Sequence, residues 1–303
     1  MIDHGAIDPP SYWCSLSGRT QVGLWRFNAT RLPSLDAPVE ETALFTLLDD
    51  ATAELAARIA LAHNTLDNPV GFTANLNITK TGASPTARLF YYEASMTQSS
   101  SRKIVIECPL FDAETGVCLM VARGVFVFME FDTLTKQLRN TTNSLDDAVD
   151  TRPTPIALHD GCELDGADLY GLSQVMNFLP HGTVQHSGGL LSRTKRLVLV
   201  QLDFGHSLSG PPIYVHGGVL GTVLYNVSAL LFSKIMDVPA DAANAATRDI
   251  NYHKGVPLEF KACTIEARIE SSGASQTVVV AKLAQGKQVY TSLKTTFILP
   301  HSA

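Results

Sequence analysis

The residues with the clearest chemical potential are His216, Gly217 and Gly218, which open about twenty almost wholly apolar residues. An apolar stretch of this length without proline predicts a long helix that begins at the tripeptide. The first amides of a helix lack intrahelical partners and carry the positive end of its dipole. Glycine lets a carbonyl oxygen approach these amides because it has no Cβ. Such amides would form an oxyanion hole, which stabilises charge developing on a carbonyl oxygen.

Each of these residues also has a purely structural interpretation. His216 either caps the helix or transfers a proton, and the two glycines either serve a ligand or only allow close packing. The apolar stretch is just long enough to cross a bilayer. It contains Asn226 and Lys234, however, and has neither aromatic belts nor a second span. A helix that is apolar on all sides also suits the centre of a soluble domain, and we expect that role.

The composition is that of an ordinary globular protein. The 303 residues are long for one domain and sufficient for two, with 45% apolar and 17% charged residues. The formal charge of −6 argues against nucleic acid as a partner, because phosphate binding needs a basic surface. The first twenty or so residues lack the basic end and apolar run of a signal peptide. We therefore expect a cytoplasmic protein.

The five cysteines are scattered through the chain and odd in number: Cys14, Cys108, Cys118, Cys162 and Cys263. Their spacing matches no zinc motif, so we expect reduced structural thiols and no metal.

The chain carries an internal repeat at long range. VEETALFTLLDDATAELAARIA, from Val39, aligns with VHGGVLGTVLYNVSALLFSKIM, from Val215, at an offset of 176 residues. The matched pairs are Leu44 with Leu220, Thr46 with Thr222, Leu48 with Leu224 and Ala53 with Ala229. Internal repeats indicate that one supersecondary unit occurs more than once.

The segments around the two expected helices repeat as well. A β-rich piece precedes each helix, at 21–29 and 196–204, and three or four β-rich runs follow it. The turns DAETG at 112–116 and AQGK at 284–287 lie at corresponding places. Each half therefore predicts a strand, a long apolar helix and then antiparallel strands, which is an α+β fold.

These boundaries predict a first unit at 1–132, a connection at 133–190 and a second unit at 191–303. The connection contains a turn-rich linker and a short helix that starts near Asp165 or Asp168 and ends before Pro180. PHGTVQHSGG at 180–189 resembles the tripeptide motif, but we interpret it as a loop, or as part of a pocket entrance. An open edge strand promotes aggregation, so we expect the two sheets to join edge to edge. Further association into a homo-oligomer is also compatible with this sequence.

One long buried helix wrapped by an antiparallel sheet, with His-Gly-Gly at the helix N-terminus, resembles the hotdog fold. The greatest similarity is to thioesterases of the 4-hydroxybenzoyl-CoA and phenylacetyl-CoA type, whose HGG motif is followed by an acid on the same helix. HGGVLGTVLYN matches the motif at His216, and the strands around both predicted turns resemble the terminal hairpin of the family. The resemblance covers both halves, so it implies a double hotdog with two long buried helices.

The chain departs from the family pattern in a complementary way. The acid position, nine residues after the His, holds Tyr225, followed by Asn226, in the second half. The first half has EET at 40–42 in place of HGG, yet its acid position holds Asp49, followed by Asp50. Sites in the family lie between two units, with amides from one and the acid from the other. The resemblance thus implies one complete site, which joins the glycine amides to Asp49, and one degenerate site.

The acid would activate water as a base or attack the thioester directly. The alternative is a structural role, because an acid beside Leu47 and Leu48 needs a partner. Weaker candidates for the substrate pocket are Thr46, Asp50, Thr222, Tyr225 and Asn226. The threonines could instead bond back to their own helices.

Substrate identity is less constrained by the sequence. Phe45, Tyr91 and Tyr214 suit an acyl or aryl group without selecting one. The basic residues Arg193, Lys195 and Arg196 either meet the phosphates of CoA or are simply solvated.

The implied activity is hydrolysis of an acyl thioester on CoA or an acyl carrier protein, without a cofactor or metal. A second possibility is a dehydratase, isomerase or cyclase of secondary metabolism that acts on a polyketide-like intermediate. It would use His216 with Asp49, although the proline-rich His motif of hotdog dehydratases is not matched. A third is a non-catalytic acyl-binding module, since one of the two sites has decayed.

Overall fold

The computed structural model describes residues 11–15, 17–26, 41–63, 66, 68–82, 89–133, 161–166, 168, 172, 184–205, 208, 214–239, 243–258 and 263–299, with the backbone alone at 11, 41–43, 63 and 185–187. Within these ranges lie two long helices, α1 (Glu41–His63) and α4 (Gly217–Met236). The strands are β1 (Ser11–Cys14), β2 (Thr20–Arg26), β3 (Pro69–Lys80), β4 (Leu89–Ser99), β5 (Lys103–Asp112), β6 (Cys118–Glu130), β7 (Cys162–Glu163), β8 (Val184–Ser192), β9 (Leu197–Phe204), β10 (Asn244–Tyr252), β11 (Cys263–Ser272), β12 (Gln276–Gln285) and β13 (Gln288–Ile298).

Helix α1 contains neither proline nor glycine and is rich in Ala and Leu, which favour helix. Its buried apolar residues recur at helical spacing, as at Leu44, Leu48, Leu55 and Ile59. This pattern places one face of α1 on the strands of the first half, with contacts to β2 through β6.

Helix α4 is buried over most of its length, as an all-round apolar helix should be. It ends at Asp237, whose left-handed backbone (φ 56°) lets its N–H donate to the Ser233 carbonyl. Among the described residues, α4 is the one helix with the length and composition of a membrane span, but 67% of that window is buried inside the fold. Burial of this extent is that of a core helix.

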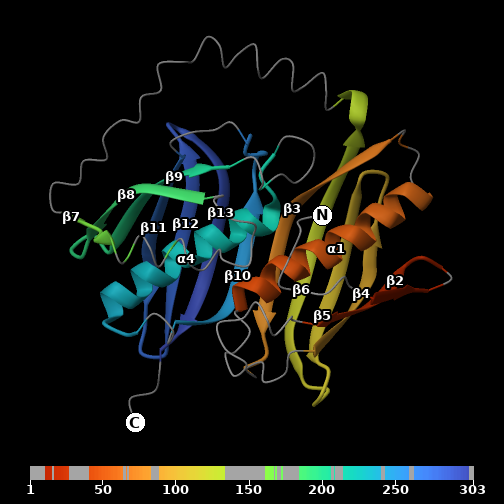
Figure 1. The fold of residues 1–303 in the computed structure, drawn as a ribbon, viewed down its shortest axis with the longest axis horizontal. Coiled ribbons are helices and arrows are strands. Elements are labelled where there is room, and N and C mark those ends of the chain that lie inside the picture. The colour runs from red at the N-terminus through yellow and green to blue at the C-terminus, as the bar shows by residue number, and fades with distance from the viewer. Residues whose placement is uncertain are drawn as a thin grey trace.

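The strands form one sheet of 13 strands in the order β1-β2-β4-β5-β6-β3-β10-β13-β12-β11-β9-β8-β7, with every neighbouring pair antiparallel. The halves meet where β3 pairs with β10, and both helices lie on the same side of the sheet (Figure 1). The order β2-β4-β5-β6-β3 is mirrored by β10-β13-β12-β11-β9. The expected edge-to-edge joint is confirmed, and it leaves neither β3 nor β10 open at its inner edge.

Two polar contacts mark an approximate two-fold axis between the halves. Thr46 Oγ1 of α1 lies 3.2 Å from Thr222 Oγ1 of α4, and Asn75 Nδ2 of β3 donates to Asn251 Oδ1 of β10 at 3.1 Å. Each pair is 176 residues apart, which is the offset of the sequence repeat. Equivalent residues can touch each other only near such an axis, so the axis passes between α1 and α4 and between β3 and β10.

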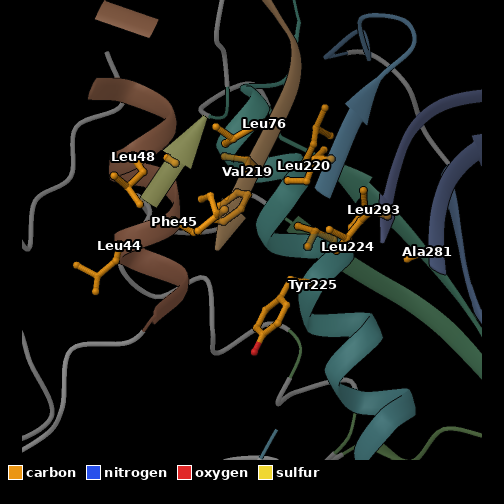
Figure 2. Packing of buried hydrophobic residues seen from close by; sticks show 14 of the residues in the cluster. Leu44, Phe45, Leu48, Leu76, Val219, Leu220, Leu224, Tyr225, Ala281 and Leu293 are labelled. Carbon is orange, nitrogen blue, oxygen red and sulfur yellow. The ribbon is translucent and has the colours of Figure 1, made fainter. Parts of the chain in front are cut away.

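The two halves share one hydrophobic core. Buried side chains of α1, α4 and both groups of strands belong to a single continuous cluster. Figure 2 shows part of this cluster, with Phe45 and Leu48 from α1, Val219 and Leu224 from α4, and Leu76 from β3. A shared core of this kind makes the halves parts of one folding unit, because burying an apolar side chain stabilises by roughly 1.5–3 kcal/mol.

The connection differs from its prediction. Residues 184–189 belong to β8 and not to a loop, because they pair with β9 from Val184 opposite Phe204 to Gly189 opposite Val200, with a register shift between His186 and Gly188. Strands β7 and β8 thus extend the second-half sheet into the predicted 133–190 connection. Residues 134–160 lie outside the described ranges. Of the short helix predicted from Asp165 or Asp168 to before Pro180, four residues are described: Asp165 is not helical, whereas Gly166, Asp168 and Leu172 are.

Candidate active site

The N-terminus of α4 is built around His216. This residue is the N-cap, with an extended backbone (φ −60°, ψ 139°), and its Nδ1 accepts the Gly218 N–H at 3.1 Å. The His216 N–H donates to the Leu208 carbonyl at 2.9 Å, which anchors the helix start to the preceding segment. The first helical bond runs from the Leu220 N–H to the His216 carbonyl at 3.2 Å. The capping interpretation of His216 is confirmed, and the Gly217 amide precedes the helical bonding.

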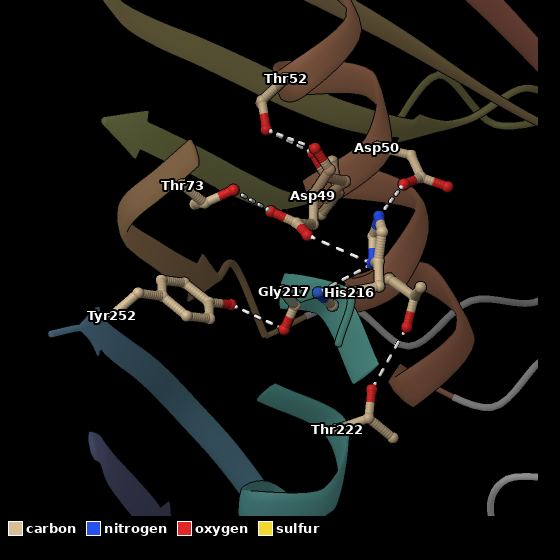
Figure 3. Close-up of polar contacts among 11 residues, drawn as sticks. Asp49, Asp50, Thr52, Thr73, His216, Gly217, Thr222 and Tyr252 are labelled. Atoms are coloured by element: carbon tan, nitrogen blue, oxygen red, sulfur yellow. Dashed lines mark hydrogen bonds and ion pairs between the residues drawn. The ribbon is translucent and has the colours of Figure 1, made fainter. Parts of the chain in front are cut away.

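Asp49, on α1, faces this helix start from the other half of the chain. A Cβ on Gly217 would lie 3.0 Å from Asp49 Oδ2, so the carboxylate sits directly against the glycine. Thr73 of β3 donates to Asp49 Oδ1 at 3.2 Å (Figure 3). The structure therefore brings together the two groups that the sequence paired, the glycine-led helix start and the acid of the first half.

Burial dominates the electrostatics of Asp49. Its side chain is almost fully buried, and this burial raises its pKa from 3.8 to about 6. The nearby His216 ring acts in the opposite direction, whereas the Asp50 charge raises the pKa further. Hydrogen bonds from the Thr73 hydroxyl and the Gly218 amide also favour the carboxylate form. Asp49 can thus gain and lose a proton close to neutral pH.

His216 joins both carboxyl groups of α1. Its Nε2 lies 2.8 Å from Asp50 Oδ1, and its Nδ1 lies 3.7 Å from Asp49 Oδ2. Burial lowers the pKa of His216, but the Asp50 hydrogen bond and the two negative charges outweigh it, and the net shift is upward. Asp50, a weaker candidate from the sequence, is therefore part of the cluster as the partner of His216.

Two further residues of the cluster were not anticipated from the sequence. Tyr252, at the end of β10, donates its hydroxyl to the Gly217 carbonyl at 2.9 Å. Burial strongly raises the pKa of Tyr252, and the Asp49 charge adds to the effect. Thr73 is the other, and it lies beside a register shift between β3 and β6. Neither belongs to a recognisable motif, and only the pairing of strands brings them to the helix start.

Of the remaining pocket candidates, Thr46 lies against the helix start, since a Cβ on Gly218 would lie 2.9 Å from Thr46 Cγ2. Thr46 and Thr222 meet at the two-fold axis. Tyr225 donates to the Ala243 carbonyl at 3.1 Å, and the Arg248 guanidinium stacks 3.7 Å from its ring centre. The Asn226 amide nitrogen is buried and has no hydrogen-bond partner within the described structure. In the expected degenerate site, residue 40 and the side chains of 41–42 lie outside the described residues.

Of the other sequence candidates, the tyrosines pack against phenylalanine rings and the basic residues are exposed. Tyr91 stacks on Phe111, and Tyr214 meets Phe72 edge to face. The basic residues Arg193, Lys195 and Arg196 are exposed in the turn between β8 and β9. Within the described ranges, no group of His, Cys, Asp and Glu side chains could hold a metal ion, and all five cysteines are free thiols.

Comparison with solved structures identifies the fold, whereas comparison by sequence finds no match. No protein-family model matches the chain, and no curated protein matches it significantly by sequence. Solved structures do match along almost the whole chain. A hotdog-fold protein of unknown function from Alicyclobacillus acidocaldarius has a TM-score of 0.53 at 11% identity, and the match covers 95% of this chain and 96% of that one.

Two further structures share this architecture. The 12:0-ACP thioesterase of Umbellularia californica has a TM-score of 0.53 at 10% identity, covering 97% of this chain and 94% of its own. An acyl-CoA thioesterase II from Mycobacterium marinum has a TM-score of 0.53 at 8% identity, covering 97% and 96%. The chain thus has a hotdog fold, in agreement with the fold expected from its sequence.

Proposed function

We propose that the protein hydrolyses an acyl thioester carried by CoA or by an acyl carrier protein. The observation that carries this proposal is the contact of the Asp49 carboxylate with Gly217 at the first turn of α4. A base beside the Gly217 amide, which precedes the helical bonding, suits attack on a carbonyl that this amide polarises. Solved proteins of similar fold that are named as acyl-CoA and acyl-ACP thioesterases support the same chemistry.

The proposed reaction starts with the thioester oxygen on the Gly217 amide. Asp49 takes a proton from water, and the water oxygen forms a bond to the carbonyl carbon. The carbonyl electron pair moves to the oxygen, where the amide and the positive end of α4 stabilise the charge. When the C–S bond breaks, the thiolate leaves with its electron pair and takes the proton from Asp49. The products are a carboxylic acid and a free thiol.

Direct attack by Asp49 to form an anhydride is the alternative route to the same products. The two routes differ in where solvent oxygen goes. In a single turnover in H₂¹⁸O, the base mechanism places the label in the product acid. The anhydride mechanism allows the label to enter Asp49, which peptide mass spectrometry would detect.

The geometry favours hydrolysis over a dehydratase or isomerase. A lyase of this fold would need His216 as a free base, but both ring nitrogens are engaged, Nδ1 with the Gly218 amide and Nε2 with Asp50. A panel of acyl-CoAs assayed with a thiol reagent separates the possibilities. Thiol release supports hydrolysis, loss of water without thiol release supports a lyase, and binding without either supports an acyl-binding module.

Replacing Asp49 with Asn tests the proposed base directly. Because Asn cannot accept a proton at neutral pH, we expect a loss of roughly 100-fold to 10,000-fold in kcat while binding of the thioester survives. The matched control is Asp112→Asn, a carboxylate of similar burial that accepts the Glu114 and Thr115 amides in the turn after β5. Equal losses in the two folded variants would contradict a catalytic role for Asp49.

A further inference from the structure

We propose that Tyr252 and Asp50 are positioning residues at the two ends of one hydrogen-bond chain, which fixes the peptide group between Gly217 and Gly218. This inference rests on the proposed thioesterase function, because this peptide follows the Gly217 N–H that would receive the thioester oxygen. Tyr252 acts on the carbonyl of this peptide, and Asp50 acts on its N–H through His216.

Three contacts make the chain continuous. The Tyr252 hydroxyl donates to the Gly217 carbonyl at 2.9 Å. On the opposite edge of the same planar peptide, the Gly218 N–H donates to His216 Nδ1 at 3.1 Å. The other ring nitrogen, Nε2, lies 2.8 Å from Asp50 Oδ1. Figure 3 shows these contacts as dashed lines, with Tyr252 at one end and Asp50 at the other.

All donors in this chain point the same way. Hydrogen bonds arranged in series polarise one another, so the hydroxyl on the carbonyl makes the Gly218 N–H a stronger donor. The His216 ring fits the chain in one neutral tautomer only, with the proton on Nε2 and the lone pair on Nδ1. A carboxylate at Asp50 selects that tautomer, because it accepts the Nε2 proton. Asp50 therefore acts on the helix amides without touching them.

Gly217 needs such restraint more than any other residue of the site. Glycine has the greatest backbone freedom, and a Cβ at this position would make a tight contact of 3.0 Å with Asp49 Oδ2. The preceding peptide is held by the helical bond from the Leu220 N–H to the His216 carbonyl, at 3.2 Å. The Tyr252 hydroxyl holds the following peptide. Together these bonds aim the Gly217 N–H without a side chain at that residue.

The repeat offers a comparison within the same chain. At the offset of 176 residues, the position equivalent to Tyr252 is Leu76, and the position equivalent to Asp50 is Asn226. The site related by the two-fold axis therefore has neither the tyrosine nor the carboxylate at the ends of the hydrogen-bond chain. Both positioning groups occur only at the site that also has the glycines and the acid.

The test compares two partly buried tyrosine hydroxyls that donate to backbone carbonyls. Tyr252→Phe removes the bond to Gly217, whereas Tyr225→Phe removes the bond to Ala243. We expect Tyr252→Phe to lower kcat roughly tenfold to 100-fold with KM changed less than about threefold, since a misaimed donor weakens transition-state binding. Tyr225→Phe should change kcat less than about threefold. Thermal melts establish that both variants are folded.

Nuclear magnetic resonance of protein labelled with ¹⁵N at His and Gly gives a readout that is independent of turnover. Tyr252→Phe should shift the Gly218 amide proton upfield, and Tyr225→Phe should leave it in place. Asp50→Asn should convert the His216 ring from the Nε2–H tautomer to a mixture of tautomers. The Tyr252→Phe/Asp50→Asn double variant should lose less activity than the product of the two single losses, because both act on one peptide.

An unchanged Gly218 resonance in Tyr252→Phe, or a loss confined to KM, would overturn the positioning role. So would a wild-type His216 with its proton on Nδ1 in the neutral state. If the wild-type protein released no thiol from any acyl thioester, the proposed function would fail instead. The resonance and tautomer measurements would still decide whether the chain of bonds exists.

Discussion

Asp49 is the residue in which stability and chemistry oppose each other. A carboxylate this deeply buried is costly to ionise, and its pKa of about 6 records that cost. The same shift makes Asp49 a better base near neutral pH than an exposed aspartate would be. Thr73 and the Gly218 amide offset part of this cost, because both lower the pKa of Asp49. The proton of this one group therefore affects both turnover and folding.

Turnover should rise with pH as Asp49 loses its proton. Since the carboxylate is the active form and its pKa is about 6, kcat/KM should fall about tenfold per pH unit well below pH 6 and level off above it. The measurement is a pH profile between 5 and 8 with a substrate that does not titrate there. A flat profile across this range would rule out Asp49 as the ionising base.

Folding stability should fall with pH as Asp49 loses its proton, whereas turnover should rise. The folded pKa of about 6 lies above the unfolded value of 3.8, so the native state binds more protons between them and stability falls as pH rises through this window. Asp49→Asn lacks this penalty. It should match the wild type below about pH 4 and gain at most about 3 kcal/mol above about pH 7. Urea unfolding at both pH values tests this, and a variant less stable than wild type at high pH would contradict it.

At the scale of elements, α1 and α4 approach closely because small and large residues alternate at the two-fold axis. Phe45 and Gly221 are equivalent in the repeat, and a Cβ on Gly221 would lie 2.4 Å from the Phe45 ring and 2.7 Å from Ile250 Cδ1. The space beside the axis therefore holds the ring of Phe45 and leaves no room for a side chain at the equivalent position, Gly221. Gly221 is required by this contact, although glycine is a poor helix former.

Gly221→Ala should destabilise the protein even though alanine favours helix. The propensity gain is about 1 kcal/mol, whereas overpacking a closed core costs about 1–3 kcal/mol and more in the tightest sites. Adding Phe45→Leu should recover part of the loss, because it removes the ring that the new methyl group meets. Chemical denaturation of the two single variants and the double variant measures this coupling. Strict additivity would show that the two positions do not share the space.

For the whole molecule, the repeat has produced two unequal halves. Asp49 faces glycines across the boundary, whereas Tyr225 in the equivalent place is covered by the Arg248 guanidinium and bonded to Ala243. A buried aromatic ring with a satisfied hydroxyl has the features of packing and not of acid–base chemistry. We therefore expect one working site for each chain, in spite of the two-fold topology.

Tyr225→Phe should leave turnover within a few fold of the wild type. The substitution keeps the ring under Arg248 and removes only the hydroxyl bond to the Ala243 carbonyl. The steady-state assay that detects the Asp49→Asn loss is the appropriate measurement. A large drop in kcat with an unchanged melting temperature would mean that the reciprocal half carries the reaction.

Much of this architecture follows from local sequence pattern. The apolar periodicity of residues 41–63, the apolar run after His216 and the β-rich pieces around them predict the two helices and most strands, because side-chain burial on one element has a fixed spacing. The offset of 176 residues predicts that both halves share one topology, and the resemblance to hotdog thioesterases implies the pairing of Asp49 with the glycines. Residues 184–189 are a strand where the sequence predicts a loop, since two glycines hide the alternation and only the pairing with β9 makes them a strand.

The amino-acid sequence by itself determined that an acid and a glycine-led helix start are present in opposite halves of a repeated α+β unit. Only the tertiary structure decided what surrounds them. Thr73 and Tyr252 reach the site through the register of β3 and β10, and the raised pKa of Asp49 comes from burial. Register and burial depend on contacts between residues far apart in the chain, and no local spacing encodes such contacts.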